Sequence, residues 1–135
     1  MTTVNELLSV VTDYTISSDG WGDYYLEVAI EIAQKLDESG KLEQCLQHLP
    51  SLDEEAKIRL IQVITNFPSS QLFEPLIGLL AQAEGELAEV LVDGLQTWSL
   101  EKEQKQQLWS IAQKFRGQSK LLDIIIDKLM TSIQL

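Results

Sequence analysis

Helical spacing of apolar residues runs along the whole chain and constrains its fold more than any other feature. Val4, Leu7, Leu8 and Val11 stand at i, i+3, i+4 and i+7, which places them on one face of a helix. The same period returns in every later segment, and no stretch alternates convincingly between apolar and polar residues as a strand would. Short β-branched runs such as residues 124–126 are embedded in helical spacing. The sequence therefore predicts an all-α protein.

Turn and capping residues mark where one predicted helix ends and the next begins. In the first half of the chain we expect a turn at Ser17–Gly20, a helix capped by Asp23 that ends at Gly40, and a short helix over 42–49 closed by Pro50. A capping box from Ser51 to Glu54 should open the next helix, which ends before Pro68. Further helices should be capped by Ser69 or Ser70 and by Ser99, with breaks at Gly85 and Gly117. Connections this short imply antiparallel neighbours. We expect stacked helical hairpins, arranged as an α-solenoid or an irregular bundle.

The net charge of −11 is concentrated near the N-terminus. Residues 1–55 hold twelve Asp and Glu against Lys35 and Lys41, a net charge of −10, whereas residues 56–135 hold nine acids against eight Lys and Arg, a net charge of −1. Because each phosphate contact needs a cation, this balance argues against direct binding of nucleic acid or of anionic membranes. An acidic end of this kind either keeps a protein soluble or attracts a basic partner.

The length of 135 residues predicts one domain over 1–135, with acidic N-terminal helices over 1–50 and hairpins over 51–135. The single cysteine, Cys45, excludes an internal disulfide and fits a reducing compartment. The first residues lack the basic region of a signal peptide, and the longest apolar runs are too short to span a bilayer. We therefore expect a cytoplasmic protein.

Two segments in the middle of the chain resemble a HEAT repeat. The first, 72–80, carries Pro75 followed by leucines, and the second, 85–95, carries small residues at Ala88 and Gly94. The resemblance implies antiparallel helix pairs stacked as a solenoid, of which about three are needed to bury their apolar faces. In size, charge and helical style the chain also resembles bacterial immunity proteins, which neutralise a cognate toxin delivered by a neighbouring cell.

Residues suited to catalysis or metal binding are few. Cys45 and His48 are the only cysteine and histidine, and they are spaced i, i+3. The sequence contains no HExxH, CxxC, glycine-rich phosphate loop or GxSxG element. We expect Cys45 to pack as a small apolar residue, although a Cys45–His48 nucleophile is the alternative. The prediction is a protein without a metal, a cofactor or a catalytic activity.

One cluster of acids and aromatics is the candidate binding site. Asp23, Glu27 and Glu31 are spaced i, i+4 and i+8, and like charges along one helical row are slightly unfavourable. The aromatics Trp21, Tyr24 and Tyr25 lie beside them, and aromatics next to charges are typical of interface hot spots. The candidate partner-binding residues are Asp19, Trp21, Asp23, Tyr24, Tyr25, Glu27 and Glu31. The structural alternative is that Trp21 fixes the start of the helix and that the acids form a solvated face.

These observations lead to three hypotheses for function. The first is an immunity-type inhibitor that covers the basic substrate cleft of a nuclease toxin with its acidic helices. The second is a structural adaptor or assembly factor that binds a partner protein through a solenoid face within 72–115. The third is an enzyme that uses Cys45.

Overall fold

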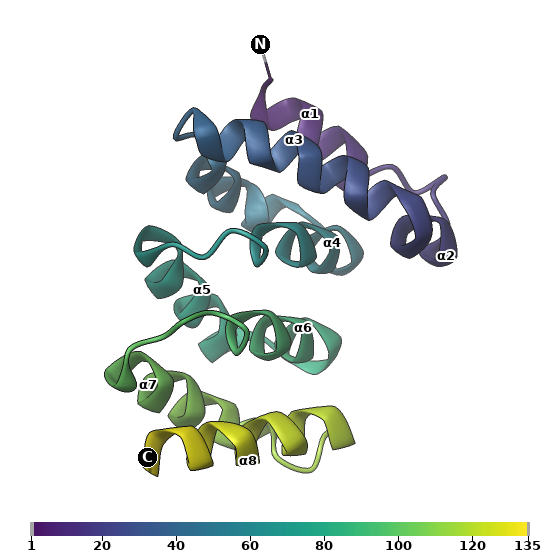
Figure 1. Cartoon of the computed structure of the whole chain (residues 1–135). Coiled ribbons are helices and arrows are strands. Elements are labelled where there is room, and N and C mark those ends of the chain that lie inside the picture. The colour runs from purple at the N-terminus through teal and green to yellow at the C-terminus, as the bar shows by residue number, and fades with distance from the viewer. Residues whose placement is uncertain (1, 135) are drawn as a thin grey trace. The chain divides into compact units, whose positions relative to one another are not determined.

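The computed structural model describes residues 2–134, and every regular element in that range is a helix, with no strand (Figure 1). This confirms the all-α prediction. The chain divides into two compact units, unit 1 over Met1–Phe67 and unit 2 over Pro68–Leu135. The division follows Phe67, whereas the internal boundary predicted from charge follows residue 50. No helix within 2–134 is both long and apolar enough to cross a membrane.

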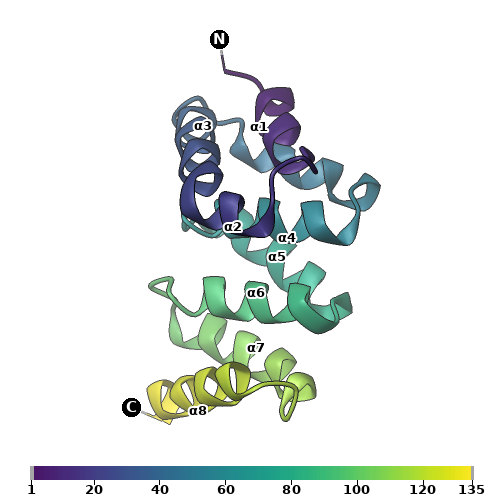
Figure 2. The same cartoon turned by 90° about the vertical axis from the view of Figure 1, so that its right-hand side faces the viewer.

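Unit 1 is built from four main helices and two short ones. Their bounds are α1 (Val4–Val11), α2 (Ser18–Gly20), the π-helix η1 (Trp21–Tyr25), α3 (Leu26–Glu38), the 3₁₀-helix η2 (Leu42–Ser51) and α4 (Glu54–Ile64). α3 packs against both α1 and α4, and η2 packs against α1 and α3 (Figures 1 and 2). Ala29 and Ala33 are fully buried on α3, and such small side chains allow neighbouring helices to approach closely.

The segment expected to be a turn at Ser17–Gly20 is instead the start of a helix. Ser17 is the N-cap, and its hydroxyl accepts a 3.0 Å hydrogen bond from the Gly20 amide. α2, η1 and α3 then follow without a break, so the helix begins before Asp23, the predicted cap. The serine, aspartate and glycine that favour a turn also favour a helix N-terminus, and the pattern alone did not separate the two.

The end of α3 was predicted correctly, and the start of α4 was not. Gly40 has φ +74°, and the Lys41 amide donates to the Leu36 carbonyl, as in a Schellman motif. α4 is capped by Asp53, whose carboxylate accepts a 3.0 Å hydrogen bond from the Ala56 amide. Ser51 lies inside η2 and donates to the His48 carbonyl, so the predicted capping box does not form there.

Unit 2 contains α5 (Ser70–Gln82), α6 (Gly85–Leu95), α7 (Lys102–Ala112), the short 3₁₀-helix η3 (Gln113–Phe115) and α8 (Lys120–Gln134). α5 packs against α6, and α8 packs against both α6 and α7. Ser69 caps α5 as predicted. α7 is capped by a Glu101–Gln104 capping box rather than by Ser99. Glu101 therefore supplies the cap that the sequence analysis assigned to the nearer serine.

α6 and α8 bury residues in the same pattern. Besides Leu87, α6 buries Ala88, Leu91, Val92 and Leu95, and α8 buries Leu122, Ile125, Ile126 and Leu129. Both sets follow i, i+3, i+4 and i+7, so each helix offers one apolar stripe to its neighbours. The shared pattern is what a repeated helical hairpin requires, and it does not distinguish one repeat family from another.

Candidate functional site

Six of the seven predicted binding residues lie exposed on the continuous helix formed by α2, η1 and α3. They are Asp19, Asp23, Tyr24, Tyr25, Glu27 and Glu31. We call them the acidic tyrosine face. The seventh residue, Trp21, lies in the core of unit 1 and is 5% exposed. The structure therefore removes Trp21 from the set of residues that a partner can reach.

Trp21 is held in the core by two residues of α4. Its indole Nε1 donates a 2.7 Å hydrogen bond to Oε1 of Gln62, and the Arg59 guanidinium lies 5.1 Å from the centre of the ring. This arrangement agrees with the alternative that Trp21 fixes the start of the helix. Trp21 is the first residue of the π-helix and the buried one within it. Tyr24 and Tyr25, in the same turn, are exposed.

Arg59 organises this part of unit 1, although the sequence analysis did not identify it. It is 3% exposed, and one of its amino groups donates 2.9 Å hydrogen bonds to the Ile16 carbonyl and to Glu55. Its other amino group donates a 3.2 Å hydrogen bond to the Asp13 carbonyl. A buried guanidinium with this set of acceptors ties α4 to the segment between α1 and α2. The sequence signal that could have identified Arg59 is a cation in line with the apolar residues Ala56 and Val63 of one helix.

The segment between α1 and α2 also carries local hydrogen bonds that lower carboxyl pKa values. The Thr15 hydroxyl and amide both donate to Asp13, and these bonds hold the pKa of Asp13 below its usual value. The bond from the Ala56 amide, followed by one from the Tyr14 hydroxyl, lowers the pKa of Asp53. Tyr14 is 53% exposed, and its hydrogen bond to Asp53 raises the pKa of its phenol. Tyr14 and Asp53 therefore shift each other's pKa values in opposite directions.

Charge is distributed unevenly between the surface and the interior of unit 1. Twelve Asp and Glu fall within 2–67, and all twelve are exposed. The same residues include four cations, of which only Lys35 is exposed, while Lys41 and Lys57 are partly covered and Arg59 is buried. The surface that a partner meets is therefore more negative than the formal charge of −8 for these residues indicates. Such a surface attracts cations over several ångströms and is screened by salt.

The acidic tyrosine face lacks internal charge partners. The two ion pairs in the described residues are Arg59–Glu55 and Arg116–Asp127, and neither includes a residue of this face. Glu27 and Glu31 share one row of α3 at i, i+4, as predicted. Asp23 belongs to the π-turn, which shifts it from the regular position that an uninterrupted α-helix gives.

The two tyrosines form a compact aromatic pair on this face. Tyr24 is 60% exposed and Tyr25 is 38% exposed, and their ring centroids are 4.9 Å apart with the planes at 75°. This edge-to-face arrangement is the favoured geometry for two aromatic rings. Exposed tyrosines beside unpaired carboxylates combine an apolar contact with hydrogen-bonding and charged groups, as interface hot spots do.

Comparison with protein-family models, curated proteins and solved structures finds no match.

Cys45 is buried against the core of unit 1, and burial raises the pKa of its thiol to about 11. A thiol with that pKa stays protonated near neutral pH, and the thiolate is the nucleophilic form. Within 2–134, no three side chains of His, Cys, Asp or Glu lie close enough together to hold a metal ion. The geometry thus supports the packing role expected for Cys45.

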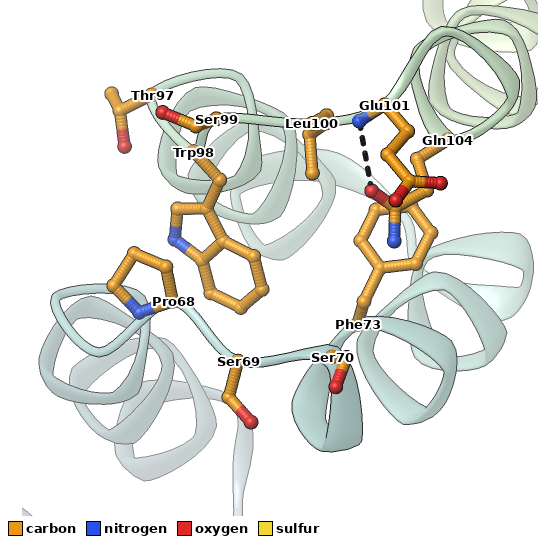
Figure 3. A pocket seen from close by; sticks show the side chains of 10 residues that line it. All are labelled: Pro68, Ser69, Ser70, Phe73, Thr97, Trp98, Ser99, Leu100, Glu101 and Gln104. Carbon is orange, nitrogen blue, oxygen red and sulfur yellow. Dashed lines mark hydrogen bonds between the residues drawn. The ribbon is translucent and has the colours of Figure 1, made fainter.

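A second candidate site is a cavity of about 390 Å³ in unit 2. It lies where α6 ends and where α5 and α7 begin, and the buried aromatics Phe73 and Trp98 line it together with Pro68 (Figure 3). Figure 3 also shows the Glu101 amide donating to Gln104, a 3.0 Å bond of the capping box. No Lys or Arg is among the lining residues. The cavity suits an apolar or hydroxyl-bearing group of a partner.

Proposed function

We propose that this chain is a non-enzymatic, protein-binding inhibitor whose acidic tyrosine face covers a basic surface on another protein. The observation that carries the proposal is the charge distribution of unit 1, in which all twelve acids are exposed, whereas two of the four cations are partly covered and one is buried. A nuclease toxin is the partner class that fits best, because a cleft that holds phosphates must be positive. In this role the protein would act as an immunity protein does.

The acids and the tyrosines would contribute differently to binding. Exposed carboxylates such as Glu27 and Glu31 would steer the partner and accelerate association, an effect that weakens with salt. Tyr24 and Tyr25 would provide apolar contact area at a small entropic cost, since each ring has only two rotatable bonds. Because Trp21 and Arg59 fix the helix from within, little ordering of its backbone would be needed when the partner binds.

The proposal is tested with a partner captured by the tagged protein from its native host and then purified. We expect a basic protein whose nuclease activity the wild type inhibits. Glu27→Gln with Glu31→Gln should weaken binding about tenfold at low salt, since two of the steering charges are lost. Glu86→Gln with Glu103→Gln removes the same charge from exposed positions of unit 2 and should have little effect.

Two features make this comparison informative. Removing like charges at i, i+4 should leave the stability of α3 unchanged or slightly higher, so weaker binding would not reflect unfolding. Wild-type affinity should also fall steeply between about 50 and 500 mM salt. An affinity that stays constant over that range, or an equal loss in both double variants, would contradict the proposal.

The adaptor function is the second candidate, and the cavity beside Trp98 favours it. A partner that inserts an apolar group there would bind with little dependence on salt. Ser70→Trp places a large side chain at the exposed rim of the cavity and should abolish such binding. Retained binding in Ser70→Trp, together with loss in the Glu27/Glu31 variant, would favour the inhibitor.

A further inference from the structure

The Tyr24–Tyr25 pair is the largest exposed aromatic group on unit 1 without a polar anchor. Asp53 raises the pKa of the Tyr14 phenol, whereas the rings of Tyr24 and Tyr25 contact each other. In an edge-to-face pair, the edge of one ring covers one face of the other, so outer ring faces remain open. With 60% of Tyr24 exposed, that open aromatic surface is accessible to a partner.

Charge complementarity decides what kind of group this surface fits. Glu27 stands three residues after Tyr24 and four after Asp23 on the same continuous helix, and residues at these spacings are neighbours on a helix surface. Lys35, the exposed cation of unit 1, stands eight residues beyond Glu27, about 12 Å along a helix. The two cation–π contacts within 2–134 use Trp21 and Phe115, so no cation of that range stacks on the tyrosine rings.

We propose that the tyrosine pair, flanked by Asp23 and Glu27, receives an arginine side chain of the basic partner, an inference that rests on the proposed function. A guanidinium is planar and weakly hydrated, so it stacks on an aromatic face while donating two parallel hydrogen bonds to a carboxylate. A lysine ammonium is a strongly hydrated point charge and makes less of both contacts. The face is therefore selective for arginine over lysine.

The same combination of groups already exists inside unit 1. The Arg59 guanidinium lies 5.1 Å from the Trp21 ring centre and donates a 2.9 Å hydrogen bond to Glu55. There, one guanidinium lies over an aromatic ring and is hydrogen-bonded to a carboxylate at the same time. The acidic tyrosine face presents the aromatic and carboxylate parts of this arrangement to solvent and lacks the guanidinium.

The test uses two peptides that differ only in their cations. One carries arginines separated by glycine and serine, and the other carries lysines at the same positions. Each is titrated at low salt into the full-length wild type, Tyr24→Leu and Tyr14→Leu, and the dissociation constants are compared. Tyr14→Leu removes the other exposed tyrosine of unit 1 and serves as the matched control. Circular dichroism establishes that each variant is folded.

We expect wild type to bind the arginine peptide about two- to fivefold more tightly than the lysine peptide. Tyr24→Leu should remove this preference and leave the affinity for the lysine peptide nearly unchanged, while Tyr14→Leu should retain it. Equal affinities for both peptides, or a preference that survives in Tyr24→Leu, overturn the arginine inference. If binding remains sensitive to salt and to Glu27→Gln with Glu31→Gln in that case, the proposed function still stands. Absence of binding by both peptides contradicts both.

Discussion

Arg59→Met tests whether one buried guanidinium holds the segment between α1 and α2 in place. Methionine keeps much of the apolar stem but is shorter than arginine and removes every hydrogen bond. The Ile16 carbonyl then loses its partner in a buried setting, which costs about 1 to 3 kcal/mol, and the partly buried Asp13 carbonyl adds about 0.5 to 1 kcal/mol. The lost stacking on Trp21 adds about 1 kcal/mol.

The ion pair with Glu55 contributes little to this total. The Glu55 side chain is 53% exposed, and an exposed carboxylate partner is worth at most about 0.5 kcal/mol. The sum is a loss of about 2.5 to 5.5 kcal/mol, which overlaps the cost of removing one member of a buried charged network. Arg59→Lys should recover less than half of it, because an ammonium does not bond two separate carbonyls while stacking on an indole.

The assay is urea unfolding followed by far-UV circular dichroism, with Arg116→Met as the control. Arg116 is also ion-paired, but its side chain is 45% exposed and that of Asp127 is 72% exposed, so its loss should change the free energy of unfolding by less than about 0.5 kcal/mol. An Arg59→Met protein within about 1 kcal/mol of wild type would refute the reasoning. It would mean that water or a rearranged segment satisfies the Ile16 and Asp13 carbonyls.

Three further predictions concern unit 1. Gly40→Ala should lower the free energy of unfolding by about 1 kcal/mol, because Gly40 has φ +74°. Gly22→Ala lies inside the π-turn with open space around a Cβ, so it should leave the free energy of unfolding unchanged or raise it. Urea unfolding of the two variants compares them. Cys45 should resist alkylation in the folded protein at mildly alkaline pH and react fully in denaturant, since burial raises its pKa to about 11; rapid labelling of the native state would contradict this. Because the pKa of Asp53 is lower in the folded protein, its carboxylate stabilises the folded state above the unfolded pKa of 3.8, and this stabilisation is lost as the pH falls through the folded pKa. The free energy of unfolding should therefore drop below about pH 4. Asp53→Asn, titrated in parallel, should show a shallower drop.

The sequence determined the features that depend only on residues close together in the chain. Apolar spacing at a period of 3.6 residues is incompatible with a strand, so the all-α class followed directly. Gly40 was identified as the end of a helix because a left-handed conformation strongly favours glycine. The exposure of Asp19, Asp23, Glu27 and Glu31 was also within reach, since ionised carboxylates remain in water unless they are paired.

Contacts between distant residues were decided only by the tertiary structure. The sequence suggested that Trp21 is a surface anchor, because its neighbours are glycines, acids and tyrosines. In the structure it is buried in contact with Gln62 and Arg59, about forty residues later in the chain. The expected turn before Trp21 is instead the start of a helix that continues through a π-turn. Local signals at Ser17 and Ser51 were ambiguous, because serine caps a helix and forms a turn with nearly equal ease. The sequence thus determined which side chains belong in water, and the tertiary structure decided which of the aromatics a partner can reach, because burial depends on packing partners far along the chain.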